Sequence, residues 1–129
     1  MALHTDLPIY KLTYQLMLLS VELTRSMPRD FKPTIGRKIN EECVNLTVLV
    51  FRANCSQDKT PYLDRLLERV QVTELLFRLS KDMRFVSVPQ YAKVIELTDM
   101  IGRQANGWRK QSASAPATSP SRRRGLSDF

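Results

Sequence analysis

The residues best suited to chemistry in this chain are basic, and they gather around one predicted turn between two helices. The cluster consists of Arg29, Lys32, Arg37 and Lys38. Asp30 is the only acidic residue between the first and last of them. Cations with so little neutralising charge beside them can contact the phosphates of a nucleic acid. The sequence therefore predicts an anion-binding site at this turn.

Catalytic chemistry has little support in the sequence. Glu41 and Glu42 are adjacent, which separates them by about 100° around a helix, whereas the carboxylates of an acid–base pair must converge on one point. We expect both glutamates to lie on a solvated face. The chain has a single histidine, His4, which excludes histidine-based metal clusters and leaves no good base to activate a serine or cysteine. The sequence predicts a non-enzymatic protein with no metal site and no cofactor.

The cysteines and two of the glycines have structural explanations. Cys43 and Cys55 fall on one predicted helix, about 18 Å apart at 1.5 Å per residue, which is too far for a disulfide. We expect two buried, reduced thiols. Gly102 and Gly107 lie inside a helical pattern, where close packing of two helices is the simplest explanation.

Composition limits the chain to one small, soluble, helical domain. It has 129 residues, 43% hydrophobic and 26% charged, with only 4 glycines, which favours helix over tight β-turns. No apolar run reaches the roughly 18 residues of a membrane span, and the beginning lacks the pattern of a leader. We expect a cytoplasmic protein. The net charge of +7 indicates an acidic partner, either a nucleic acid or an acidic protein surface.

Apolar periodicity and prolines divide the chain into four helical segments, at about Pro8–Arg25, Pro33–Cys55, Thr60–Met83 and Ser87–Lys110. Thr60 reads as the N-cap of the third, and Ser87 with Gln90 forms a capping box at the fourth. Short connections predict an all-α, antiparallel up-down four-helix bundle over residues 1–110. Residues 111–129, rich in Ser, Pro and Arg, are predicted to be a disordered basic tail.

Several helices carry a second apolar row beside the first, which indicates self-association. In the third helix, Arg65, Arg69, Arg78 and Lys81 alternate with acidic residues. This pattern fits a solvated face with ion pairs about as well as a binding stripe. Trp108 is in phase with the apolar positions of the fourth helix, so we expect a core or interface residue rather than a base-stacking one.

A resemblance to a known family rests on several short motifs taken together. They are Tyr10-Lys11, Met27-Pro28-Arg29 with Ile35-Gly36, Arg78-Leu79, Tyr91, and Ile101-Gly102-Arg103 with Gly107-Trp108. From about residue 7 to residue 110, the chain resembles a family of four-helix bundles. This family includes the accessory variability determinant (Avd) of diversity-generating retroelements. It also includes proteins encoded in intervening sequences of large-subunit ribosomal RNA genes.

The retroelement branch of this resemblance implies a non-catalytic homopentamer with a basic surface. Such a protein binds the element's reverse transcriptase and template-region RNA and supports mutagenic reverse transcription. The matching positions imply contacts at Arg29, Arg37, Arg78 and Arg103, with weaker additions at Lys32, Lys38 and Lys81. The ribosomal branch implies instead a protein-interaction module with no role in reverse transcription.

Overall fold

The computed structural model describes residues 3–114 of the chain. A 3₁₀ turn at His4–Asp6 precedes the first helix, and a π-helical turn, η2 (Lys32–Gly36), leads into the second. In this described range no helix is both long and apolar enough to cross a membrane. The four α-helices are α1 (Pro8–Arg25), α2 (Arg37–Cys55), α3 (Thr60–Asp82) and α4 (Val88–Ser114).

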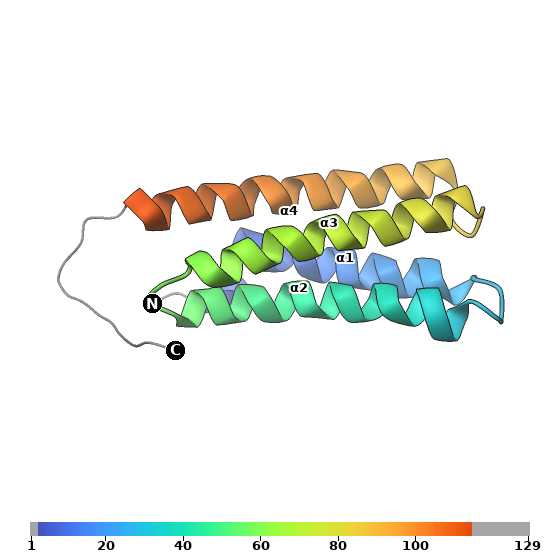
Figure 1. Ribbon diagram of the computed structural model, residues 1–129, viewed down its shortest axis with the longest axis horizontal. Coiled ribbons are helices and arrows are strands. Elements are labelled where there is room, and N and C mark those ends of the chain that lie inside the picture. Colours follow the sequence, from blue (N-terminus) through green and yellow to red (C-terminus); the bar gives the residue numbers. More distant parts are fainter. Residues whose placement is uncertain (1–2, 115–129) are drawn as a thin grey trace.

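Consecutive helices run in opposite directions and pack side by side in one bundle (Figure 1). Contacts join α1 to α2, α2 to α3, α3 to α4, and α4 back to α1, so each helix has two neighbours. The α1–α2 and α3–α4 turns lie together at one end, on the right in Figure 1, which we call the hairpin end. The predicted all-α four-helix bundle is confirmed, and the alternating directions fit its up-down form.

Two predicted helix starts have different outcomes. The capping box before α4 is confirmed: the Ser87 N–H donates to Gln90 Oε1 (2.9 Å) and the Gln90 N–H donates to Ser87 Oγ (3.2 Å). The N-cap prediction for α3 is wrong. Lys59 occupies that position, α3 already includes Thr60, and the Thr60 N–H donates to Asp58 Oδ1 (3.2 Å). An aspartate two residues earlier takes over the capping role, since its carboxylate reaches the free amide.

Helix α4 is longer than predicted at its C-terminal end. It continues to Ser114, whereas the sequence predicts a tail from Gln111. The first proline after Trp108 is Pro116, so nothing in the intervening residues interrupts the backbone hydrogen bonds. The predicted disorder of the remaining tail, which includes Arg122–Arg124, concerns residues 115–129, outside the described part of the chain.

The core takes one apolar stripe from each helix, and burial of each such side chain stabilises the fold by about 1.5–3 kcal/mol. Its largest fully buried members include Leu16, Ile39, Leu46, Leu63, Leu66, Phe77 and Ile101. Much of the predicted second apolar row remains in solvent. Its exposed members include Tyr14, Val21, Val44, Val48, Phe51, Leu75 and Leu79. The single bundle therefore leaves apolar surface uncovered on several helices.

The two cysteines lie in different environments. Both are free thiols, as predicted, but only Cys43 is buried. Burial raises the pKa of the Cys43 thiol to about 12, because the thiolate would lose its hydration. The prediction that Cys55 is buried is wrong. It is the last residue of α2, where the apolar stripe ends and the chain turns towards solvent.

Candidate nucleic-acid and partner interface

The two turns at the hairpin end meet through an aromatic pair. Phe31, between α1 and α2, and Phe85, between α3 and α4, have ring centroids 4.8 Å apart. Both side chains are half-buried. Aromatic pairs at this separation stabilise a contact beyond the area they bury. The pair therefore joins two turns far apart in sequence into one surface, which we call the tip.

Three exposed cations adjoin this aromatic pair in the sequence, and we call them the tip cations: Arg29, Lys32 and Arg84. Among residues 3–114, none of them has an acidic partner within 4.0 Å. Asp30 lies in the same turn and is exposed, but it pairs with none of them. The positive charge of the tip is therefore available to an anionic ligand.

Arg84 has an unusual backbone conformation. Its φ angle is 67°, in the left-handed region that glycine and asparagine favour and that costs other residues about 1–2 kcal/mol. The conformation ends α3: the Arg84 N–H donates to the Lys81 carbonyl (2.9 Å) and the Phe85 N–H donates to the Ser80 carbonyl (2.8 Å). Glycine is the usual residue after such a helix end. Arginine here adds a cation to the tip at a cost in stability.

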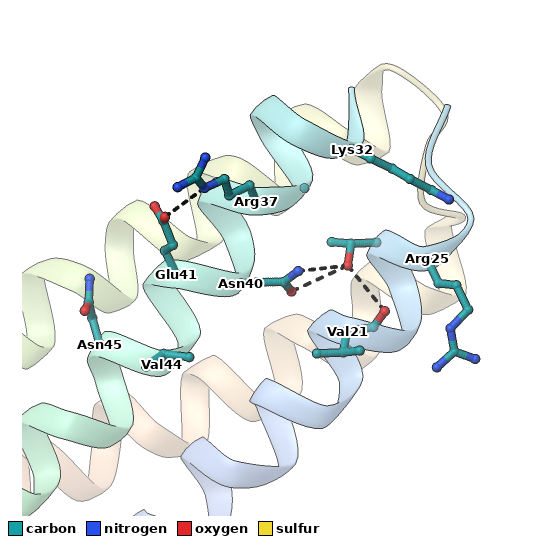
Figure 2. Close-up of a pocket in the computed structure, with 10 residues that line it drawn as sticks. Val21, Arg25, Lys32, Arg37, Asn40, Glu41, Val44 and Asn45 are labelled. Carbon is teal, nitrogen blue, oxygen red and sulfur yellow. Dashed lines mark hydrogen bonds and ion pairs between the residues drawn. The ribbon is translucent and has the colours of Figure 1, made fainter. Parts of the chain in front are cut away.

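A groove between α1 and α2 begins at the hairpin end and has a volume of about 710 Å³. Three cations line it, Arg25, Lys32 and Arg37, together with the acid Glu41 and other residues. Figure 2 shows Lys32 extending from η2 towards the end of α1, where Arg25 lies. Arg25 was absent from the predicted site, although it is only four residues from Arg29 in the sequence. This α1–α2 groove is therefore predominantly cationic.

The floor of the α1–α2 groove is polar and internally bonded. The Asn40 Nδ2 group donates to Thr24 Oγ1 (3.3 Å), and the Ser20 hydroxyl donates to Asn40 Oδ1 (3.0 Å). Ser20 and Thr24 are buried, whereas Val21 and Val44 on the walls are 48% and 45% exposed. Hydrogen bonds between helices fix their relative register, so the walls are held in place.

Four of the predicted contact residues form ion pairs one helical turn apart, in which the carboxylate neutralises the cation. The pairs are Arg37–Glu41 (3.2 Å), Lys38–Glu42 (3.6 Å), Arg78–Asp82 (4.0 Å) and Arg103–Asp99 (2.9 Å). Lys81 lies 3.6 Å from Asp82, with its ammonium group 4.8 Å from the centroid of the Tyr91 ring. The pairs of Arg37, Arg78 and Arg103 are exposed on both sides, and such pairs contribute only about 0.3–0.5 kcal/mol each.

The predicted residues do not form one site. Arg78 and Lys81 lie in the last turn or so of α3, so the fold places them at the hairpin end with the predicted cluster of the first turn. Arg103 is fifteen residues beyond Val88, where α4 begins, which is about 22 Å along the helix. It lies instead in a second groove.

Glu42 contradicts the predicted solvated face. Glu41 is exposed, but Glu42 is only 2% exposed. Its Oε1 lies 3.0 Å from Arg69 Nε of α3, although the two atoms lack hydrogen-bond alignment. The contact is thus an ion pair between α2 and α3. The Glu42 side chain points into the α2–α3 seam, which the sequence of α2 alone could not indicate.

The second groove lies between α3 and α4 and has a volume of about 490 Å³. The sign of its charge is opposite to that of the α1–α2 groove. Among the described residues that line it, three are acidic and one is basic: Glu68, Glu74 and Asp99, and Arg103. The Thr98 hydroxyl donates to Glu74 Oε2 (2.6 Å). This α3–α4 groove is therefore predominantly acidic.

The predicted close packing at the α4 glycines is wrong. A Cβ added at Gly102 or Gly107 would have no heavy atom within 4 Å, apart from its own chain neighbours. Gly102 lines the α3–α4 groove, and Gly107 lies beyond it. By contrast, Trp108 packs against the core as predicted. Neither glycine is required by packing within the described chain.

The arrangement offers a cationic tip and two grooves of opposite charge as binding surfaces. Residues 3–114 contain no group of three or more His, Cys, Asp and Glu side chains that could hold a metal ion.

Comparison with models of protein families matches residues 8–112 to the family described as bAvd-like. No curated protein and no solved structure matches the chain. The family match covers α1, α2 and α3 and all but the last two residues of α4.

Proposed function

The chain belongs to the bAvd-like family, and from this membership we propose that it is a non-enzymatic accessory protein of a diversity-generating retroelement. It binds the element's reverse transcriptase and template RNA, or the cDNA copied from that RNA, and so supports mutagenic reverse transcription. It acts in the cytoplasm as a homo-oligomer, a pentamer if it follows the relatives that its sequence resembles.

One observation supports this proposal above the others: the tip presents three exposed cations from two separate turns, without acidic partners in the described chain. Two helical hairpins and the Phe31–Phe85 contact hold these turns in place. Ordering the tip for binding therefore costs little conformational entropy. Phosphate contacts of this kind position a nucleic acid without reading its sequence. An accessory protein needs that property, because the polymerase and template supply the sequence information.

The ion-paired residues of the predicted site extend this surface. The hairpin end also carries Arg37, Lys38, Arg78 and Lys81. The pairs of Arg37 and Arg78 are exposed on both sides, so they are weak enough for a phosphate to replace the carboxylate. Arg103 lies too far along α4 to contact the same phosphates as the tip. It belongs to a separate contact with the polymerase or RNA.

Co-purification with the reverse transcriptase of the same element, carrying its template RNA, tests the proposal. Two variants separate the contacts. The tip variant is Arg29→Ala/Lys32→Ala/Arg84→Ala, and the flank variant is Arg78→Ala/Arg103→Ala/Arg109→Ala. Each loses three positive charges, but every arginine of the flank variant has a carboxylate partner.

We expect wild type to form a stable complex with several copies of this chain, as measured by light scattering. The tip variant should retain helicity and lose about tenfold or more in RNA affinity, whereas the flank variant should lose much less. Equal losses in the two variants would refute the tip assignment. A wild-type chain that binds neither polymerase nor RNA would refute the function and favour a protein-interaction role such as that of the ribosomal intervening-sequence branch.

A further inference from the structure

The two grooves lie on opposite faces of the bundle. Because the contacts run from α1 through α2, α3 and α4 back to α1, the α1–α2 face and the α3–α4 face share no helix. A molecule with two different binding faces on opposite sides can join a neighbour at each face. Repetition of such a contact produces a ring or a filament.

The charges of the two grooves are complementary. The α1–α2 groove has Arg25, Lys32 and Arg37 against Glu41, whereas the α3–α4 groove has three acids against Arg103. The charged side chains of the first groove are all exposed, as is Asp99 in the second. Complementary potentials of this kind favour association and fix its orientation, while two identical faces would repel each other.

The walls of the α1–α2 groove also carry exposed apolar surface, which a binding partner would bury. Val21 and Val44, which face this groove from α1 and α2, are about half exposed, and Figure 2 shows both near the bonded Asn40. Further along the same two helices, Tyr14, Val48 and Phe51 are exposed as well. Apolar groups bordered by charges are typical of protein interfaces.

Gly102 gives the acidic groove an unexplained feature. Glycine in the middle of a helix is less favourable than alanine, and no neighbour in the described chain would obstruct a Cβ at this position. The absence of a side chain leaves room above the α4 backbone, inside a groove that is open to solvent. A side chain from another molecule can enter that room.

We propose that the α1–α2 groove of one copy binds the α3–α4 groove of a second copy, with Arg25 and Arg37 facing Asp99 and Glu68 across the contact. This inference rests on the homo-oligomer of the proposed function but needs neither polymerase nor RNA. The α1–α2 groove starts at the hairpin end, whereas Gly102 lies about 21 Å along α4. Neighbouring copies are therefore staggered, and closure into a ring requires bundles tilted against the ring axis.

Two variants disable one face each. Arg25→Glu/Arg37→Glu reverses the charge of the α1–α2 groove and leaves the other face intact. Gly102→Trp places an indole ring in the α3–α4 groove, at a position where an added Cβ meets no atom of its own chain within 4 Å. The matched control is Gly107→Trp, which makes the same substitution on the same helix at a glycine outside the groove. Circular dichroism confirms that each variant keeps its helicity.

Sedimentation velocity of the purified chain alone then measures assembly. We expect wild type and the Gly107→Trp control to form the same multimer, and each of the two face variants to be monomeric. An equimolar mixture of the face variants should form a 1:1 dimer that grows no further, because one native contact remains. A monomeric wild type, an unchanged multimer in Gly102→Trp, or a mixture that stays monomeric would overturn the proposal. Each result is independent of whether the polymerase binds.

Discussion

The flanks of the bundle and its tip carry cations in different ways. On the flanks, helical spacing places a carboxylate one turn from the cation, as in Arg37–Glu41 and Arg103–Asp99. At the tip, Arg29 and Arg84 lie in turns, where no periodic neighbour can supply such a partner. Helical spacing thus neutralises part of the positive charge on the helices. The tip cations have no acidic partner in the described chain, so their charge remains available to a ligand.

The largest expected effect concerns the one buried acid of the flanks. Glu42→Ala removes the partner of Arg69 in the α2–α3 seam, where Arg69 is itself largely shielded from water. We expect the free energy of unfolding to fall by about 2 kcal/mol, measured by urea denaturation. Glu41→Ala is the control, because its pair with Arg37 is exposed and should contribute less than about 0.5 kcal/mol. If Glu42→Ala and Glu41→Ala lowered the free energy of unfolding by similar amounts, the burial of Glu42 would not strengthen its ion pair.

A smaller effect of opposite sign is expected at the tip. Arg84→Gly removes the steric cost of the positive φ angle, so unfolding should require about 1 kcal/mol more. The same variant should bind RNA several-fold more weakly, because a tip cation is lost. Arg84→Ala serves as the comparison: it removes the cation but retains the strained conformation, so its affinity should fall without the gain in stability. Tighter RNA binding by Arg84→Gly would exclude Arg84 from the contact.

The smallest effect is expected on the flank. Arg103→Ala breaks an exposed pair with Asp99, so the free energy of unfolding should change by no more than about 0.5 kcal/mol. We also expect a smaller loss of RNA affinity than Arg29→Ala causes, as titration of labelled RNA would measure. If Arg103→Ala lowered the RNA affinity more than Arg29→Ala, the principal phosphate contact would lie on α4. The proposed difference between the tip and the flank would then be wrong.

The sequence predicts the helices well because prolines and caps are local signals. Pro8 and the Ser87–Gln90 capping box mark helix starts without knowledge of the rest of the fold. Apolar periodicity likewise predicts buried positions such as Leu16 and Phe77. It cannot say how much of a second apolar row will be covered, because that depends on where neighbouring helices lie.

The site was only partly predictable for the same reason. Arg29 and Lys32 stand out because they cluster in the sequence, whereas Arg84 joins them only through the meeting of two distant turns. Its positive φ angle is set by the way α3 ends. In the sequence, Glu42 cannot be distinguished from its exposed neighbour Glu41. Its burial results from the packing of α3 against α2, which places Arg69 beside it. The open space above Gly102 likewise depends on the position of α3, which the pattern of α4 does not contain.

The most direct test of the account is the salt dependence of RNA binding by wild type and by the tip variant. The logarithm of the association constant falls with the logarithm of salt concentration in proportion to the phosphates contacted. Loss of three tip contacts should make this slope shallower by about 2 to 3. The flank variant should reduce the slope less, because each of its arginines already has a carboxylate partner. Equal slopes for wild type and the tip variant would contradict the claim that the unpaired cations of the two turns hold the nucleic acid.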